Sequence, residues 1–370
     1  MRVTLGDVCE KGSSNLKQSD VINKTGAYPI YGAAGYLGNV DFYHQDKPYV
    51  AVVKDGAGIG RTTLHPAKSS VIGTMQYLLP KSNVLPEYLY YVVQYMHLEK
   101  YFTGATIPHI YFKDYKAEQF NLDAMERQKE IVASLQKVET LIKVRQQQLQ
   151  KLDELVKARF VEMFGMPGTD TKGWGLQYLG TCCELNPKKG TDKRLVSGLS
   201  VSFVPMPAVS ESGKIDASQI KAYDEVKTGF TYFAENDVLF AKITPCMENG
   251  KGAVAVGLCN NIGFGSTEFH ILRPINNKSN PYWLYSLTSF DAFRKDAADN
   301  MTGSAGQRRV PAVFLEKYKV TLPPIELQNQ FAAFVKQTDK SKLQVPSGNA
   351  LCIRYPIFYR NNIFERSIKC

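Results

Sequence analysis

The segment MERQKEIVASLQKVETLIKVRQQQLQKLDELVKARFVEMF, residues 125–164, organises this chain. It contains neither Pro nor Gly, so it predicts a single helix of ~60 Å at ~1.5 Å per residue. Mostly apolar side chains recur every seven residues in two registers, a pattern typical of a coiled-coil seam. The first register is Ile131, Val138, Arg145, Leu152 and Arg159, and the second is Leu135, Ile142, Leu149, Val156 and Met163. Arg145 is interpreted as fixing the register or reaching out to solvent.

A single narrow apolar stripe cannot bury itself, so this helix needs a partner. The chain supplies one, because its sequence pattern returns at an offset of 200 residues, 325 minus 125. Ile325, Glu326, Gln328, Ala333 and Val335 repeat Met125, Glu126, Gln128, Ala133 and Leu135. LGTCCE at residues 179–184 likewise echoes LGDVCE at residues 5–10. The chain therefore reads as a tandem duplication of globule and helix, whose two helices pack most simply as an antiparallel pair.

The second helix is predicted to be shorter than the first. Its apolar positions Phe331 and Val335 are followed by Thr338 and Lys342, and the segment VPSG at residues 345–348 ends any helix. This shortening predicts that part of the helix pair is unmatched and that the apolar positions near Leu152 and Val156 of the first helix are left exposed.

The predicted fold class is α+β, with two mixed α/β globules separated by long helices that form an antiparallel coiled coil. The predicted domains are a first globule at 1–120, a central spacer helix at 121–168, a second globule at 169–322, a shortened second spacer helix at 323–344, and a divergent basic, aromatic tail at 345–370.

Composition narrows the functional classes. A chain of 370 residues with 44% hydrophobic residues accommodates two domains with cores. The net charge of +10 suggests a polyanionic partner, or ordinary solubility charge. Seven cysteines without a CxxC pair indicate neither a zinc site nor a disulfide framework. We therefore expect the protein in a reducing cytoplasm. We find no signal peptide or membrane-spanning apolar run, and expect neither secretion nor a membrane partner.

A glycine-rich turn with two cations, residues 54–61, follows an apolar strand in the first globule. A cofactor-binding loop is one interpretation, but that motif needs a helix to follow, and TTLHP at residues 62–66 predicts none. A hairpin turn, or a backbone and lysine contact to phosphate, is favoured.

The second globule carries loops at the matching places. The strand that begins at Asp237 runs into a loop bounded by Lys242 and Lys251, placed as Lys54 is in the first globule. The loop GSAGQRRVP at residues 303–311 stands where GATIP at residues 104–108 stands, and gains two arginines and a glutamine.

With these segments the chain resembles the specificity (S) subunit of a bacterial type I restriction-modification system. The resemblance covers nearly everything from Leu5 to about Lys342. It rests on residues 28–38, 106–116 and 237–251, on the helix start PPIELQ at 323–328, and on their duplicated order around the long spacer helix. It implies two target recognition domains, each reading one half of a split asymmetric site in double-stranded DNA, with the helices as a ruler.

The resemblance also implies partners. The helices would dock two methyltransferase (modification) subunits, together with restriction/translocase subunits. The chain itself would be non-catalytic and hold no cofactor, with S-adenosylmethionine, Mg²⁺ and ATP expected only on the partners. The helix positions expected to serve partner binding and the coiled coil are Ile131, Leu135, Val138, Ile142, Leu149, Leu152, Val156, Phe331 and Val335.

Side-chain chemistry divides the candidate DNA contacts into two groups. Arg reads guanine, and Asn or Gln reads adenine, through paired hydrogen bonds in the major groove. Asn249, Gln307, Arg308 and Arg309 are predicted base readers, whereas Lys54, Arg61, Lys242 and Lys251 are predicted phosphate contacts. The rival interpretation has the lysines keeping strand ends soluble and the arginines pairing with surface carboxylates. His109 is interpreted as a loop-packing or helix-docking residue.

Three other functions remain as alternatives. NPYW at residues 280–283 resembles the signature of an adenine methyltransferase but lacks its second Pro, so we interpret it as the start of a helix over 281–289. A coiled-coil structural or adaptor protein is the second alternative. A truncated, non-functional specificity subunit is the third.

Overall fold

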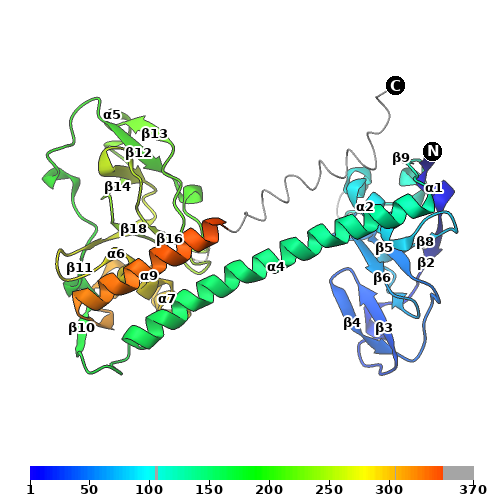
Figure 1. The fold of residues 1–370 in the computed structure, drawn as a ribbon, viewed down its shortest axis with the longest axis horizontal. Coiled ribbons are helices and arrows are strands. Elements are labelled where there is room, and N and C mark those ends of the chain that lie inside the picture. Colours follow the sequence, from blue (N-terminus) through cyan, green and yellow to red (C-terminus); the bar gives the residue numbers. More distant parts are fainter. Residues whose placement is uncertain (105–106, 305, 345–370) are drawn as a thin grey trace. The chain divides into compact units, whose positions relative to one another are not determined.

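A computed structural model describes residues 1–104, 107–304 and 306–344 (Figure 1). The predicted tail at 345–370 lies outside the described residues. The described chain forms two compact modules: a first module that ends at Gln147 and a second module that begins at Gln148. They meet within helix α4, Met125–Phe164, which has the bounds that the sequence predicts. The predicted domain boundaries stay predictions.

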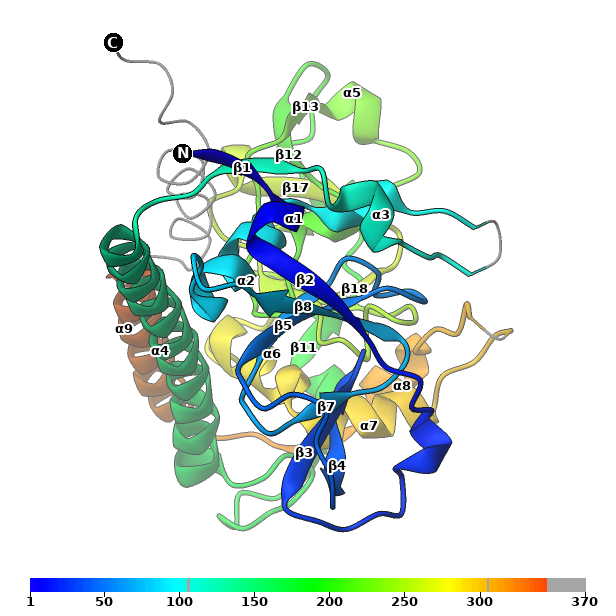
Figure 2. The ribbon, with the colours of Figure 1, turned by 90° about the vertical axis from the view of Figure 1, so that its right-hand side faces the viewer.

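The first module contains three antiparallel or mixed sheets (Figure 2). The larger sheet has the strand order β2-β8-β5-β6 and is antiparallel throughout. A smaller sheet, β4-β3-β7, contains a parallel pair, and β1 pairs with β9. The elements are β1 (Arg2–Thr4), α1 (Leu5–Val8), β2 (Cys9–Ser13), β3 (Tyr28–Gly32), β4 (Gly35–Val40), β5 (Tyr49–Val53), β6 (Thr62–His65), β7 (Ser70–Val71), β8 (Met75–Pro80), α2 (Pro86–Tyr95), α3 (Phe112–Tyr115) and β9 (Gln119–Asn121).

The second module repeats this plan. Its larger sheet, β11-β18-β15-β16, is antiparallel, its smaller sheet is β13-β12-β17-β14, and β10 pairs with β19. The elements are β10 (Leu176–Tyr178), β11 (Cys183–Leu185), β12 (Ser200–Val204), β13 (Ile220–Ala222), α5 (Tyr223–Val226), β14 (Thr231–Ala234), β15 (Val238–Ala241), β16 (Gly252–Val254), β17 (Ile262–Gly265), β18 (Phe269–Pro274), α6 (Pro281–Ser289), α7 (Asp291–Asp299), α8 (Ala312–Lys317), β19 (Lys319–Thr321) and α9 (Ile325–Gln344). Both modules are therefore α+β, as predicted.

The first turns of α4 pack against their own module. Ile131 and Leu135 are buried in the core that contains Tyr88 and Val92 of α2. This corrects the seam prediction, because the globule covers these two positions. Neighbouring Val132, which lies in neither predicted register, is buried in the same core. A helix that docks on a sheet and a second helix buries a wider stripe than a two-helix seam does, so more than two heptad positions are covered.

The middle of α4 is covered less. Val138, Ile142 and Leu149 are only half-buried, as is Arg145. Leu141, Val144 and Leu155 are between 42% and 48% exposed. This stretch therefore presents apolar surface on a helix that is otherwise polar.

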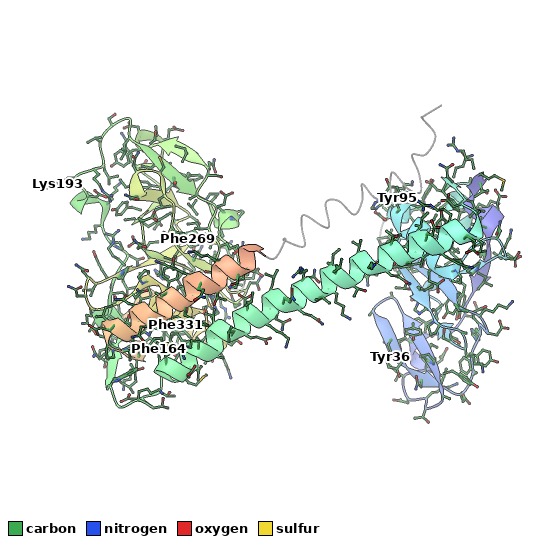
Figure 3. The ribbon with its side chains drawn as sticks, viewed as in Figure 1. Tyr36, Tyr95, Phe164, Lys193, Phe269 and Phe331 are labelled. Atoms are coloured by element: carbon green, nitrogen blue, oxygen red, sulfur yellow. The ribbon has the colours of Figure 1, made fainter. Side chains whose placement is uncertain are left out.

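The end of α4 packs antiparallel against α9 within the second module (Figure 3). Phe331 of α9 lies between Phe160 and Phe164, with ring centroids 5.5 and 5.4 Å away. Asp153, earlier in α4, pairs with Lys342, late in α9, at 2.8 Å. Neither phenylalanine of α4 is in the predicted registers, because the pattern followed a strict heptad and missed the bulky pair at i and i+4.

The predicted exposure near Leu152 and Val156 is wrong for these two side chains, although Leu155 between them is 48% exposed. Leu152 and Val156 are both half-buried, and Val156 packs against the core of the second module. The α4–α9 contact also continues past Val335 through polar residues, since Lys342 of α9 pairs with Asp153 of α4. The apolar pattern fades in the sequence, but the α4–α9 contact does not.

A buried glutamine explains the repeated residue at the start of each spacer helix. Gln128 accepts a hydrogen bond from the Leu85 N–H at 2.9 Å and donates to the Asn83 and Asp123 carbonyls. In the second module Gln328 accepts from Asn280 and donates to the Lys278 and Pro323 carbonyls. Both side chains are fully buried. Each glutamine thus fastens its spacer helix to the start of α2 or α6.

We expect Gln328→Leu to destabilise the second module by about 1–3 kcal/mol, because it leaves one buried N–H and two carbonyls without their partner. Chemical denaturation followed by the fluorescence of Trp283, buried in this module, measures the change. The control is Gln330→Leu, an exposed position of the same helix, for which we expect almost no effect. Equal losses of stability for the two variants would contradict this role of Gln328.

No helix in the part of the chain that the structure covers is both long and apolar enough to cross a membrane. The five cysteines of the described residues are free thiols. Within the same residues, no three His, Cys, Asp or Glu side chains are grouped to hold a metal ion.

Candidate nucleic-acid interface

The glycine-rich turn of the first module is a hairpin loop between β5 and β6. The Val53 N–H donates to the Arg61 carbonyl at 2.9 Å, and the Gly60 N–H donates to the Val53 carbonyl at 2.9 Å. A strand follows the turn, so the cofactor-loop interpretation is wrong and the hairpin interpretation is confirmed. Gly60 has a φ of 80°, and a Cβ there would lie 2.6 Å from the Glu99 nitrogen. Close approach of the chain therefore explains this glycine.

Main-chain hydrogen bonds join this hairpin loop to a second loop, which runs from Thr103 to His109. The Ile110 N–H donates to the Lys54 carbonyl at 3.0 Å, and the Gly56 N–H donates to the Pro108 carbonyl at 2.9 Å. Thr103 and His109 exchange two bonds of 2.8 Å that close the second loop. The predicted phosphate contact at Lys54 is thus held at the meeting point of two loops.

The second module builds the same junction from different residues. The Val310 N–H donates to the Lys242 carbonyl at 2.9 Å, and the Thr244 N–H donates to the Arg308 carbonyl at 3.0 Å. Thr302 and Arg309 exchange bonds of 2.9 and 2.8 Å. The bonds correspond one to one with those of the first module. The predicted equivalence of Lys54 with Lys242, and of the two later loops, is therefore confirmed by the backbone.

The side chains on this shared frame differ between the modules. Pro108 occupies the place of Arg308, and His109 occupies the place of Arg309. His109 contacts the carboxylate of Asp55, whose own equivalent in the second module is Ile243. The same backbone thus presents two different sets of chemical groups.

The guanidinium group of Arg309 is hydrogen-bonded to other groups of the protein. Its Nε and Nη2 donate to the two carboxylate oxygens of Glu268 at 2.9 and 2.8 Å, and its Nη1 donates to the Gln307 carbonyl. The Glu268 carboxylate raises the pKa of Arg309, and the guanidinium holds the pKa of Glu268 below its usual value. Carboxylate pairing was the rival interpretation for the two arginines, and for Arg309 it is the one that the geometry supports.

Arg308 has a different environment. Its side chain is exposed, and it makes no hydrogen bond or ion pair with any residue that the structure describes. Gln307 and Asn249 are exposed as well, while Lys242 and Lys251 are half-buried at the two ends of their loop. Among the candidate cations of the second module, Arg308 alone is exposed.

The two candidate cations of the first module are both partly constrained. Arg61 is exposed and donates through Nη1 to the carbonyl of Ala33, in the turn between β3 and β4, at 2.9 Å. Lys54 is half-buried, and burial, together with the nearby Lys11, lowers the pKa of its ammonium group. Arg61 thus links the loop to the smaller sheet. An anion placed beside Lys54 would stabilise the charged form of its ammonium group.

Sequence reasoning missed two aromatic side chains beside this junction. Phe102 and Tyr111, which flank the Thr103–His109 loop, are 60% and 47% exposed. Exposed aromatic faces are typical of surfaces on which the bases of single-stranded nucleic acids stack. The available signal was the position of these residues on either side of a glycine-bearing loop.

The methyltransferase-like NPYW segment has a structural explanation. Asn280 caps α6, and its Oδ1 accepts a hydrogen bond from the Tyr282 N–H at 2.9 Å. Pro281 is the first residue of that helix and Trp283 is buried in the core. The predicted helix over 281–289 is confirmed, so the segment is a helix start.

We expect the second module to lose stability as the pH falls through the lowered pKa of Glu268. In the unfolded chain this carboxyl has its ordinary pKa of 4.5, so its contribution is complete above that value and disappears below the folded pKa. Unfolding measured across this acid range, with Glu268→Gln as the comparison, tests it. An identical acid dependence in the variant would contradict the role of this pair.

Comparisons with known proteins agree on one family. The family described as "Type I restriction modification DNA specificity domain" matches residues 1–154 and 198–347. The chain is 40% identical over 161 residues to the EcoAI specificity subunit, and 40% over 156 residues to the EcoEI specificity subunit, both type I restriction enzyme subunits of Escherichia coli. These matches cover 43% and 41% of this chain, but only 26% and 25% of those relatives.

Solved structures share the fold. One is a type I restriction-modification S subunit from M. genitalium, with a TM-score of 0.61 at 14% identity over 99% of this chain and 96% of that one. Another, from work on complex assembly and conformational transition of the type I R-M system, has a TM-score of 0.51 at 15% identity over 98% of this chain and 95% of that one.

Proposed function

We infer the function from one premise: this chain belongs to the family of type I restriction modification DNA specificity domains. We propose that it is the DNA-recognition subunit of a type I restriction-modification complex. Its two modules each read one half of a split, asymmetric site in double-stranded DNA. The chemistry of methylation and cleavage belongs to partner subunits, which also carry S-adenosylmethionine, Mg²⁺ and ATP.

One observation carries this proposal: a single main-chain frame occurs twice with different side chains. The bonds at Lys54 and Lys242 are equivalent, yet proline and histidine in one copy replace two arginines in the other. Base readout depends on the donors and acceptors that side chains present in the major groove. Two equivalent junctions that carry different chemical groups therefore suit two different half-sites.

The environment of each residue refines its proposed role. Arg308, Gln307 and Asn249 are exposed and have planar polar groups, which suits base contacts. Lys54, Lys242 and Lys251 lie at strand ends beside the loop junctions, which suits phosphate contacts that position the DNA. Arg61 has donors left after its bond to Ala33 and belongs with the phosphate contacts. Arg309 supports the loop through Glu268.

The partner proposal rests on α4. Leu141, Val144 and Leu155 expose apolar surface along a helix that joins two modules. Such a surface on a polar helix suits a protein partner better than solvent. We propose that methyltransferase subunits, and through them restriction/translocase subunits, dock along the spacer helices.

The decisive experiment is co-expression with a cognate methyltransferase subunit, followed by sequencing of adenine methylation across a host genome. Methylation at one split motif is the expected result, and it would give both half-sites and their spacing. Co-purification without methylation would indicate a subunit that has lost function. Failure of the methyltransferase to co-purify would favour the coiled-coil adaptor.

We expect Arg308→Ala to relax specificity in the half-site that the second module reads and to leave the other half unchanged. The loss of a bidentate contact to a base corresponds to about 1–3 kcal/mol of discrimination at that position. Arg308→Lys is the matched variant, because it keeps the charge but not the planar fork. Equal relaxation of both halves would contradict the two-module assignment.

A further inference from the structure

A buried arginine lies under the loop that follows β15. Arg294 belongs to α7 and is only 7% exposed. Burial of a guanidinium is costly unless its donors are satisfied, and it lowers the pKa of this group. No carboxylate forms an ion pair with Arg294 among the residues that the structure describes. The donors of this guanidinium must therefore be satisfied by groups other than carboxylates.

The partners of Arg294 are two carbonyl groups of the loop between β15 and β16. Its Nη1 donates to the Met247 carbonyl at 2.6 Å, and its Nη2 donates to the Gly250 carbonyl at 3.0 Å. The guanidinium also lies 5.7 Å from the ring centroid of Phe240, at the end of the strand that leads into the loop. One side chain thus holds both the turn and the strand from which it starts.

The loop has a shape that needs such a support. It forms a helical turn in which the Met247 N–H donates to the Ile243 carbonyl and the Asn249 N–H donates to the Pro245 carbonyl. Carbonyls at the end of a helical turn favour a cation, and here the Met247 carbonyl accepts from Arg294 as well as from the Gly250 N–H at 3.1 Å. The turn closes at Gly250, whose φ is 91°, and the next residue, Lys251, returns to β16.

We propose that Arg294 is a positioning residue for DNA recognition by the second module. It fixes the turn that presents Asn249 and Lys251, and so sets discrimination at that half-site without touching DNA. This inference rests on the proposed function for its DNA part. Among the described residues Arg294 is the only buried arginine, and the hairpin loop of the first module has no such support, so we expect the effect at one half-site alone.

The first test measures the loop without DNA. Hydrogen exchange of the full chain is compared between the wild type, Arg294→Met, which keeps the length of the side chain without its donors, and Arg294→Lys. The control is Lys295→Met, an exposed neighbour on α7. In Arg294→Met we expect exchange at Asn249 to Lys251 to rise at least about tenfold, because two charge-assisted hydrogen bonds are lost. Arg294→Lys should restore part of the protection.

The result that would overturn the proposal is exchange that does not change in the loop, or that rises equally in β17 and β18. A general rise would mean that Arg294 serves the core of the module alone.

The second test measures discrimination. The ratio of affinities for the cognate site and for a site altered in one half is determined for each half-site in turn. We expect Arg294→Met to lower the ratio at the second half-site by roughly tenfold, a typical effect of losing about one good base contact, and to leave the first ratio unchanged. A global loss of folded protein would lower all affinities together and would not change either ratio.

The two tests separate the possible failures. Wild-type protein that discriminates no site would overturn the proposed function, while hydrogen exchange would still decide whether Arg294 holds the loop. Loosened exchange with both ratios unchanged would overturn the role of Arg294 in recognition.

Discussion

Phe331→Ala should lower the free energy of unfolding of the second module by about 3–5 kcal/mol, the usual cost of removing a fully buried phenylalanine. Phe331 is fully buried, and its ring meets those of Phe160 and Phe164 edge on. Truncation opens a cavity between α4 and α9 that rigid helices cannot close. Hydrogen exchange at core amides, resolved by module, measures the loss.

The matched control for this prediction is Phe334→Ala on the same helix. Phe334 is half-buried, and the Arg159 guanidinium lies 6.0 Å from its ring, so we expect a loss of about 1 kcal/mol. The core of the first module, around Tyr88, should keep its protection in both variants. Equal losses in the two variants would show that Phe331 is not the centre of the helix contact.

Binding to DNA should weaken steeply with salt. Four candidate phosphate contacts, Lys54, Arg61, Lys242 and Lys251, would give a slope of about −3.6 in a plot of log affinity against log salt, at about −0.9 for each phosphate neutralised. Between about 50 and 200 mM salt the affinity would then fall by roughly 150-fold. Fluorescence anisotropy with a labelled duplex, for the full chain or its complex, measures this slope.

Single substitutions measure how much each residue contributes to the salt dependence of the affinity. Lys242→Met should make the slope shallower by about one unit if this lysine contacts a phosphate. Lys340→Met, an exposed position on α9, is the control and should leave the slope unchanged. A slope near zero for the wild type would exclude backbone-dominated DNA binding and favour the adaptor alternative.

Residue pattern predicted the long helix correctly to both ends. The segment contains no helix breaker, Gly165 follows its last residue, and its start matches the start of the second helix, which Pro324 precedes. Pattern also predicted the duplication, and Gln128 and Gln328 show why it worked. A fully buried side chain with three hydrogen bonds tolerates little change, so its repetition marks an equivalent position.

The heptad pattern led to a wrong prediction of what packs against α4. A heptad identifies a helix face but not the surface against which that face packs, so Ile131 and Leu135 were assigned to a helix pair although a globule covers them. The contact of α4 with α9 uses Phe160, Phe164 and Phe331, and it continues through an ion pair, Asp153 with Lys342, that no apolar pattern reveals.

Local sequence patterns were enough to predict the duplicated architecture, the bounds of α4, the matching loops and the types of side chain on them. These follow from local preferences and from the repetition of residues along the chain. Whether each candidate side chain is exposed or paired depends on contacts that form only in the folded protein. Arg308 and Arg309 are adjacent and chemically identical, yet one is exposed and the other is bound by Glu268, 41 residues away. The sequence pattern did not identify Arg294, because its partners are backbone carbonyls. Every residue has a carbonyl, and only the fold determines which of them an arginine binds.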